Sequence, residues 1–298
     1  MPPFRTLLEI DGHVVAADVQ LRDDGRPPVL FLHGLLATLE LAPELFVDPE
    51  AESWIALSLP GHAPGRLPPG RPPRLDANLF GQLVETALQR LIGSQAVIAT
   101  GWSTGGFAAL TLAIRHPRRV AAVATFAGFA GGRLAGSIGW LTWLAEGWLG
   151  AAGVRAGLTV AAHLPPLQRL FMRTVTADGG ALARAPAHVL ARLETAVAAH
   201  DPRAVAAVLS AIRQLDITAR LGEIRVPAWI VGGDRDPLIP AATTRAIAAA
   251  IPGAALRLYP DAGHLFFCEW PGFREDFAAW RRSLPGPGSA PATMHRLA

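Results

Sequence analysis

The sequence of 298 residues contains no lysine, so all 27 of its basic residues are arginine, against 24 Asp and Glu. The isoelectric point near 10.2 comes from an arginine surplus that stays charged until very alkaline pH, whereas the formal net charge at pH 7 is only +3. The densest basic cluster, "RHPRRV" at 115–120, is short. This charge pattern excludes the broad basic stripe of nucleic-acid-binding proteins, and we expect no nucleic-acid partner.

The chain also has a single cysteine, Cys268, which excludes an internal disulfide and is typical of the reducing cytoplasm. The first stretch, "MPPFRTLLEIDGHVV", lacks the basic region followed by an apolar core that marks a secretion signal. No apolar run reaches the roughly 18 to 20 residues that span a bilayer. The nearest, residues 136–153, carries Glu146 in its middle. We therefore expect a cytoplasmic protein without an integral membrane segment.

Short apolar stretches rich in β-branched residues alternate with longer stretches rich in alanine and leucine. This alternation predicts an α/β fold with helices around a mostly parallel central sheet. Several strand candidates are continuously apolar, as are strands that are covered on both faces. We expect strands at 13–19, 28–34, 53–61, 96–103, 120–128, 227–234 and 255–263, and helices at 76–92, 104–116, 241–250 and 272–282.

One interval interrupts this alternation. From 129 to 222 the sequence predicts no strand, only helices separated by turn signals such as "HLPP" and "HDPR". We expect residues 1–128 and 223–285 to form the core domain, and residues 129–222 to form a helical cap, or lid, inserted over the edge of the sheet. The tail 286–298, rich in glycine, proline and alanine, is expected to be flexible.

Residues 99–110, "ATGWSTGGFAAL", surround Ser103 with residues that have small side chains or none. A predicted strand precedes this stretch and a predicted helix follows, so "GWSTG" forms a sharp link between them. Gly101 and Gly105 remove the Cβ atoms that would clash in so tight a turn. In this setting the G-x-S-x-G pattern is typical of a nucleophile elbow, which exposes a serine hydroxyl to substrate. We predict Ser103 as a nucleophile.

A serine hydroxyl becomes a nucleophile when a base takes its proton and an acid orients that base. His264 lies in a loop after the last predicted strand, where its ring can reach the carboxyl edge of the sheet. The loop "VGGDRDPLIP" offers two acids: Asp234, which can cap the turn, and Asp236, which lies further into the loop. We favour Asp236, which gives the chain order Ser103, Asp236, His264. We expect four other histidines to be solvated: His13, His116, His188 and His200.

The tetrahedral intermediate of such a reaction needs hydrogen-bond donors for its oxyanion. The backbone N–H of Thr104 follows the nucleophile at the start of a helix, whose dipole favours negative charge. Leu35 supplies the second N–H, from the loop after the strand "VLFLHG". We expect His33, beside Gly34, to brace this loop in preference to acting as a base.

We expect an apolar pocket under the cap, because residues 129–222 are rich in tryptophan and leucine. Trp140 and Trp143 stand at near-helical spacing on one face, which either packs on the core or contacts substrate. The residues that we assign to the substrate pocket are His33, Trp102, Phe129, Trp140, Trp143 and Leu265. No cluster of His, Asp or Glu has metal-ligand spacing, so we expect neither a metal nor another cofactor.

Five motifs resemble those of the α/β-hydrolase superfamily and occur in the family's order: "LHG" (32–34), "SLPGH" (58–62), "GWSTGG" (101–106), "GGDRDPLIP" (232–240) and "DAGHLFF" (261–267). The elbow is similar to that of the pimeloyl-carrier-protein methyl ester esterases, in which D-x-x-[IV]-P marks the acid, and this implies Asp236. A weaker likeness, through "LLATLEL" and "GHLFF", is to intracellular polyhydroxyalkanoate depolymerases. The chain departs from these families at Ser58, where they usually carry Asp, and at "GHAPGR". The resemblance therefore implies the chemistry more than the substrate.

The resemblance implies a serine carboxylic-ester hydrolase that acts through an acyl-enzyme, and the apolar pocket expected under the cap predicts small to medium, largely apolar esters. We expect a monomer or homodimer. Alternatives on the same triad are a lactonase, a thioesterase, a polyhydroxyalkanoate oligomer hydrolase, a C–C hydrolase or a perhydrolase. A non-enzyme alternative is a catalytically silent ligand-binding protein. Epoxide hydrolases and haloalkane dehalogenases resemble this fold but use an Asp nucleophile. The serine at position 103 disfavours both of these activities.

Overall fold

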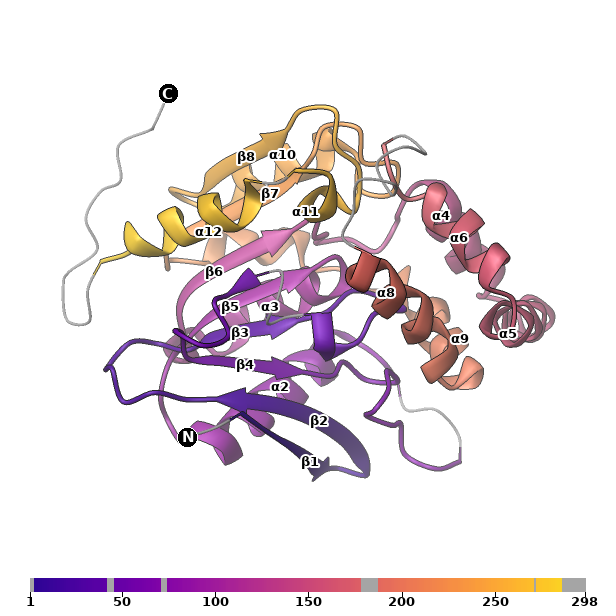
Figure 1. Cartoon of the computed structure of the whole chain (residues 1–298), viewed down its shortest axis with the longest axis horizontal. Helices are drawn as coiled ribbons and strands as arrows, with labels where there is room; N and C mark the ends of the chain where they lie inside the picture. The colour runs from indigo at the N-terminus through magenta and orange to yellow at the C-terminus, as the bar shows by residue number, and fades with distance from the viewer. Residues whose placement is uncertain (1–2, 42–45, 71–73, 178–186, 271, 286–298) are drawn as a thin grey trace.

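The computed structural model describes residues 3–41, 46–70, 74–177, 187–270 and 272–285, and an eight-stranded sheet lies at its centre (Figure 1). The strands are β1 (Phe4–Ile10), β2 (His13–Gln20), β3 (Val29–Leu32), β4 (Trp54–Leu57), β5 (Val97–Trp102), β6 (Val120–Phe126), β7 (Ala228–Gly233) and β8 (Ala255–Tyr259). Their order across the sheet is β1-β2-β4-β3-β5-β6-β7-β8. β2 pairs antiparallel with β1 and β4, and every other pair is parallel. The predicted α/β fold with a mostly parallel sheet is confirmed.

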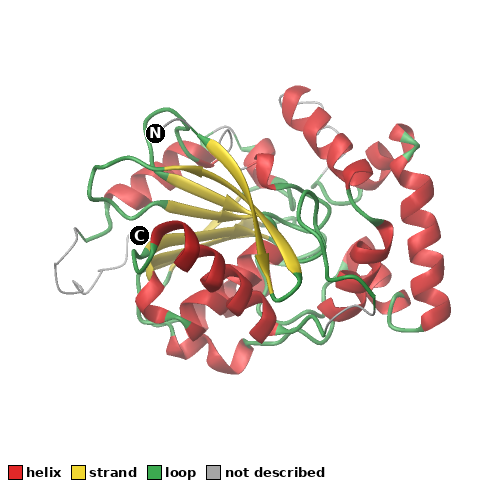
Figure 2. Cartoon of the chain, turned by 90° about the horizontal axis from the view of Figure 1, so that it is seen from below, coloured by secondary structure: helices red, strands yellow, loops and turns green. Residues whose placement is uncertain are grey.

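Helices cover both faces of this sheet and also extend beyond one end of it (Figure 2). The α-helices are α2 (Ala77–Ile92), α3 (Thr104–Arg115), α4 (Gly136–Leu144), α5 (Trp148–Ala162), α6 (Pro165–Arg173), α8 (Ala187–Ala199), α9 (Pro202–Ile212), α10 (Ala241–Ala250), α11 (Phe266–Glu269) and α12 (Phe273–Arg282). Short 3-10 helices are η1 (Leu39–Leu41), η2 (Pro117–Arg119) and η3 (Thr218–Glu223). The four helices expected around the sheet are confirmed within one residue at each end. β1, in contrast, is a strand that the sequence analysis missed.

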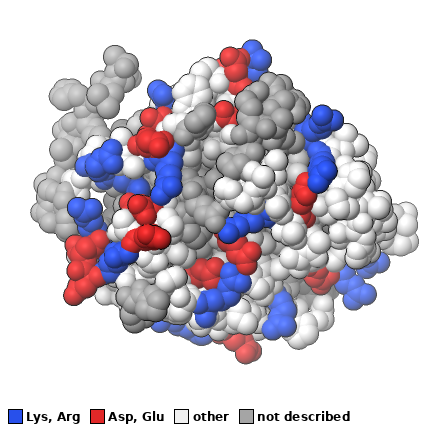
Figure 3. Space-filling view, in the orientation of Figure 1, with Lys and Arg blue, Asp and Glu red and all other residues white. Residues whose placement is uncertain are grey.

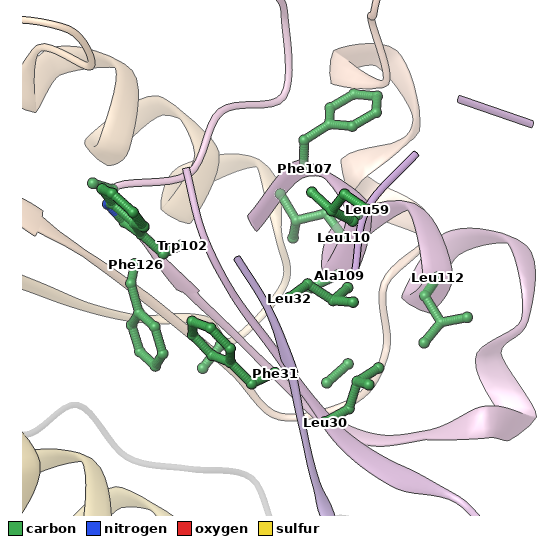
Figure 4. Packing of buried hydrophobic residues seen from close by; sticks show 14 of the residues in the cluster. Leu30, Phe31, Leu32, Leu59, Trp102, Phe107, Ala109, Leu110, Leu112 and Phe126 are labelled. Atoms are coloured by element: carbon green, nitrogen blue, oxygen red, sulfur yellow. The ribbon is translucent and has the colours of Figure 1, made fainter. Parts of the chain in front are cut away.

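The core has two halves, one on each face of the sheet, because successive side chains of a strand point to opposite faces. On one face, Phe31 stacks on Phe46 with ring centroids 4.4 Å apart, and Phe126 stacks on Phe46 at 5.1 Å. On the other face, Leu32 lies beside Ala109 of α3 (Figure 4). Strands β3, β4 and β5 are buried along their whole length, which agrees with their continuously apolar sequences.

Helices α4 to α9 occur in the connection between β6 and β7. Within this connection, we call residues 129–177 and 187–222 the helical insertion. In Figure 1 its helices stand at the end of the sheet toward which the parallel strands point. The two ends of the insertion meet in an antiparallel bridge between Gly131 and Asp216. Within its described residues the insertion has no strand beyond this bridge, as the sequence predicts.

The surface carries charges of both signs. In Figure 3 the blue basic and red acidic side chains are interspersed over the visible face. Among the described residues, no helix combines the length and apolar character needed to cross a bilayer. The tail that is expected to be flexible, residues 286–298, lies outside the described residues.

Candidate active site

Ser103 occupies the turn between β5 and α3, where its backbone φ is 54°. A positive φ is unfavourable for a residue with a Cβ atom and persists where the surroundings impose it. Here the Ser103 N–H donates to the Phe126 carbonyl at 2.8 Å. A Cβ on Gly101 would overlap the Gly105 carbonyl, and a Cβ on Gly105 would overlap the Leu32 carbonyl. The two glycines therefore permit the close backbone approach that presents Ser103 at the start of α3.

His264 and Asp236 come from the loops after β8 and β7 and form a hydrogen-bonded pair. His264 Nδ1 lies 2.8 Å from Asp236 Oδ2, while Asp236 Oδ1 accepts from the backbone N–H groups of Leu238 at 2.8 Å and Ile239 at 2.9 Å. Both members of the pair are buried. A carboxylate on Nδ1 selects the tautomer whose Nε2 can accept a proton. Asp234, the alternative acid, is exposed at the end of β7.

Backbone contacts on both sides of His264 hold it in place. Its N–H donates to the Val175 carbonyl at 3.0 Å, so the helical insertion contacts the histidine directly. Its carbonyl accepts from the Trp102 indole N–H at 3.1 Å. Trp102 also packs on the loop after β3, since a Cβ on Gly34 would lie only 2.8 Å from its ring. Trp102 thus connects the elbow, the histidine loop and the loop after β3.

Ser103 and His264 line a single cavity of about 70 Å³. Its wall combines the loop after β3 and the elbow with residues of the helical insertion. The described residues that line it are Leu35, Leu36, Ala37, Trp102, Ser103, Thr104, Leu134, Ile138, Gln168, Phe171, Met172, Val175, Leu193, Val197, Leu238, His264 and Leu265. Within the described part of the chain, the backbone N–H groups of Leu35 and Thr104 donate to no other protein group. Both candidate oxyanion donors are therefore present at the cavity and unengaged.

The structure corrects the assignment of Trp140 and Trp143 to the pocket. Both lie on the outer face of α4, where they are 59% and 57% exposed. The opposite face of α4 is the buried one, and it carries Ile138, Gly139 and Thr142. Of this helix, Ile138 lines the cavity.

Two further assignments are corrected, whereas Trp102 and Leu265 do line the cavity. Phe129 lies in the core, stacked on Phe107 with ring centroids 5.3 Å apart. His33 is fully buried behind the wall and braces the loop, as expected of it: its Nδ1 pairs with the Gly34 carbonyl at 2.8 Å, and its Nε2 accepts from the Leu59 N–H at 3.0 Å. Gln168, Phe171 and Met172 of α6 are wall residues that the sequence analysis missed.

Three buried histidines lie together beside the loop after β3, which lines the cavity. The His62 ring is 4.9 Å from that of His33 and 5.1 Å from that of His200. Burial lowers the pKa of His33 to about 3 and that of His200 to about 4, and it lowers the pKa of His62 well below 6.5. His200, expected to be solvated, is 5% exposed and its Nδ1 accepts from the Ala63 N–H at 3.0 Å. His13, expected to be solvated as well, is buried in β2.

The single thiol of the chain, Cys268, lies in α11, close to His264 in the sequence. Burial raises the pKa of Cys268 to about 12, so its reactive thiolate form is scarce at neutral pH. Among the described residues, no group of three or more His, Cys, Asp and Glu is arranged to hold a metal ion.

The sequence matches the family described as "alpha/beta hydrolase fold" over residues 27–271. A pimeloyl-[acyl-carrier protein] methyl ester esterase of Aromatoleum aromaticum is 29% identical over 254 residues, which are 83% of this chain and 94% of that protein. A protein of the same name from Neisseria meningitidis is 30% identical over 265 residues, 88% of this chain and 94% of that protein. The crystal structure of the enol-lactonase from Burkholderia xenovorans LB400 has a TM-score of 0.75 and 19% identity, and the match covers 93% of this chain and 100% of that one. The family match spans Ser103, Asp236 and His264.

Proposed function

The chain belongs to the α/β-hydrolase family, and on that premise we propose that it is a serine carboxylic-ester hydrolase. Ser103 is the nucleophile, His264 the general base and Asp236 the acid that orients it. The observation that carries this assignment is the 2.8 Å hydrogen bond between His264 Nδ1 and Asp236 Oδ2, beside the cavity that Ser103 lines. The relatives named as methyl ester esterases support hydrolysis of an ester.

In the proposed reaction, His264 Nε2 takes the hydroxyl proton of Ser103 while the serine Oγ attacks the ester carbonyl carbon. Asp236 stabilises the imidazolium that forms. The tetrahedral intermediate collapses when its C–O bond breaks, and the leaving alkoxide takes the proton from His264. A water molecule, deprotonated by His264, then attacks the acyl-enzyme. The carboxylic acid product leaves and the Ser103 Oγ recovers its proton.

The negative oxygen of both intermediates accepts hydrogen bonds from the backbone N–H groups of Leu35 and Thr104. Donors that are already in place stabilise developing charge because they need no reorganisation during the reaction. Thr104 is the first residue of α3, so the positive end of the helix dipole adds to the effect.

The substrate is a small-molecule ester that is largely apolar and of small to medium size. This follows from the cavity wall, whose described residues include no arginine, aspartate or glutamate. The helical insertion acts as the cap, because its residues Ile138, Phe171 and Val175 line the same cavity as Ser103. The single cysteine supports a cytoplasmic setting, in which the enzyme works as a monomer or homodimer.

The proposal is tested by labelling and kinetics together. A fluorophosphonate probe is expected to label the wild-type protein at Ser103, and Ser103→Ala is expected to lose labelling and at least a thousandfold in kcat/KM on p-nitrophenyl esters. Retained hydrolysis in Ser103→Ala contradicts the assignment, and an unlabelled wild type favours a ligand-binding protein. The values of kcat/KM on esters, lactones and thioesters of graded acyl length then show which of these substrate classes the protein hydrolyses best.

A further inference from the structure

Gln168 is the one polar residue of the described cavity wall that the proposed reaction does not use. The other polar wall residues, Ser103, Thr104 and His264, all belong to the proposed catalytic machinery. Gln168 comes from α6 of the helical insertion and is only 4% exposed. Its neighbours in the wall include Phe171 and Met172 of the same helix. A polar side chain is thus maintained in surroundings that are otherwise apolar.

The orientation of the Gln168 amide follows from its partners. Its nitrogen donates to the Ala161 carbonyl at 2.8 Å and lies 3.4 Å from the Ala162 carbonyl. These carbonyls end α5, where the last turn of a helix has few internal donors; the Ala161 carbonyl also accepts from the Leu164 N–H at 3.2 Å. Because a carbonyl can only accept, the amide nitrogen must face them. The amide oxygen, Oε1, therefore points away from the end of α5.

Gln168 Oε1 is buried and has no hydrogen-bond partner among the described residues. A buried acceptor without a donor is unfavourable, and native proteins keep few of them. A ligand that brought a donor to Oε1 would remove this cost, whereas a purely apolar ligand would leave it in place. The wall thus favours a ligand that carries a hydrogen-bond donor over a purely apolar ligand.

We propose that Gln168 Oε1 accepts a hydrogen bond from the substrate, so that the preferred esters carry a neutral O–H or N–H donor within an otherwise apolar chain. This inference rests on the proposed ester hydrolysis, since it assigns the substrate class of the same cavity. The donor is neutral because no described wall residue offers a carboxylate to an ammonium group, and a substrate carboxylate would face Oε1 as one acceptor faces another.

The experiment compares matched probes in the wild type and in Gln168→Met, which keeps the side-chain length and removes the acceptor. The hydroxyl arm pairs phenyl hexanoate with phenyl 3-hydroxyhexanoate and phenyl 6-hydroxyhexanoate. The amide arm pairs phenyl 5-oxohexanoate with phenyl N-acetyl-β-alaninate, in which N–H replaces one CH2. For at least one donor position, the ratio of kcat/KM with and without the donor is expected to fall about tenfold in Gln168→Met. Leu170→Ala alters an exposed residue of the same helix that does not line the cavity, and it is expected to leave the ratio unchanged.

Binding provides a readout that needs no turnover. Calorimetry with Ser103→Ala and Ser103→Ala/Gln168→Met is expected to show the same loss of preference for the donor-bearing probe. Equal ratios in the two proteins overturn the inference, even when Ser103 hydrolyses every ester. Esters that bind but are not hydrolysed by the wild type contradict the proposed function, while the binding preference still decides the role of Gln168.

Gln168 also caps α5, so the wild type gives a second test that does not depend on the variant's folding. It is expected to bind and hydrolyse the N–H probe at least as well as the CH2 probe, although the N–H group is the costlier of the two to remove from water. A wild type that discriminates against every donor-bearing probe overturns the inference.

Discussion

The elbow around Ser103 and the helical insertion meet at one cavity, but they differ in how closely their backbones are packed. At Gly105 a Cβ atom has no room, whereas at Gly153 and Gly157 of α5 it would have nothing within 4 Å. All six residues of β5 are buried, but of the fifteen residues of α5 only Val154 is. The groups that we propose to react are therefore positioned by the densely packed sheet. Eight of the seventeen described wall residues come from the helical insertion, whose outer helix α5 is loosely packed.

This difference suggests that reactivity and substrate preference respond to different substitutions. Changes at the carboxyl edge of the sheet should affect the reaction or the fold as a whole. Changes on the outer helices should be tolerated, because groups that are exposed lose little on substitution. The outer face of the insertion carries Trp148, which is 79% exposed.

The largest effect is expected for Asp236→Asn. The asparagine carbonyl can still accept from Leu238 and Ile239, but its NH2 group would then face His264 Nδ1 and favour the wrong tautomer. We expect kcat/KM to fall about 10³- to 10⁴-fold on p-nitrophenyl esters, with a thermal midpoint within a few degrees of the wild type. A loss of tenfold or less would remove Asp236 from the proposed triad.

Next in size is Gly105→Ala, which tests the dense side of the comparison. The added methyl group meets the Leu32 carbonyl, which is backbone of β3 and cannot rotate away. We expect the free energy of unfolding, measured with urea, to fall by about 3 kcal/mol or more. An alanine accepted here at a cost under about 1 kcal/mol would show that the elbow is less tightly packed than its geometry indicates.

Acid is expected to weaken the contact between the helical insertion and the loop after β4, where His200 Nδ1 accepts from the Ala63 N–H at 3.0 Å. Burial holds the pKa of His200 near 4 and that of His33 near 3, whereas histidine in the unfolded chain titrates near 6.5. Below pH 6.5 the unfolded state binds more protons, so stability falls as the pH drops toward 4. We expect a loss of about 1 to 3 kcal/mol between pH 7 and pH 5 by urea unfolding.

His200→Gln is the matched variant for this acid effect. Its side-chain oxygen can still accept from the Ala63 N–H, but it does not titrate. The variant is expected to lose less stability than the wild type over the same pH interval, because His33 and His62 remain. Parallel curves for the two proteins would exclude His200 from the acid response.

The smallest effect is expected for Gly157→Ala, the counterpart of Gly105→Ala in the loosely packed region. The new Cβ meets nothing within 4 Å, and alanine favours the helix over glycine. We expect the free energy of unfolding to rise by about 0.5 to 1 kcal/mol, with kcat/KM within twofold of the wild type. A destabilised variant would indicate that α5 is packed more closely than its exposed surface suggests.

The sequence reveals the candidate triad because each member follows a strand. Ser103, Asp236 and His264 come after β5, β7 and β8, and parallel strands bring their carboxyl ends to one edge. The backbone turns around these residues depend on their immediate neighbours in the sequence, so short motifs predict them. The geometry of the wall depends instead on how helices pack, which short motifs do not record.

Particular residues show where that limit lies. α4 is apolar on all sides, so its periodicity does not tell that Ile138 faces inward and Trp140 outward. The burial of His200 depends on Ala63, 137 residues earlier in the chain. The sequence does not predict that Gln168 is buried, because its burial depends on how α6 packs against the end of α5. β1 escapes detection because, as an edge strand with mostly exposed side chains, it lacks both an apolar run and regular alternation.

The bridge between Gly131 and Asp216 has a consequence for how such a protein can change. Gly131 and Asp216 pair where the chain leaves the sheet and where it returns. The segment between these two residues is therefore a loop whose ends are held together. Its length and helix content can vary at a modest entropic cost, with the strand order and the serine elbow left as they are. The bridge therefore marks the junction at which a module from another enzyme could be grafted to give the same chemistry a new selectivity.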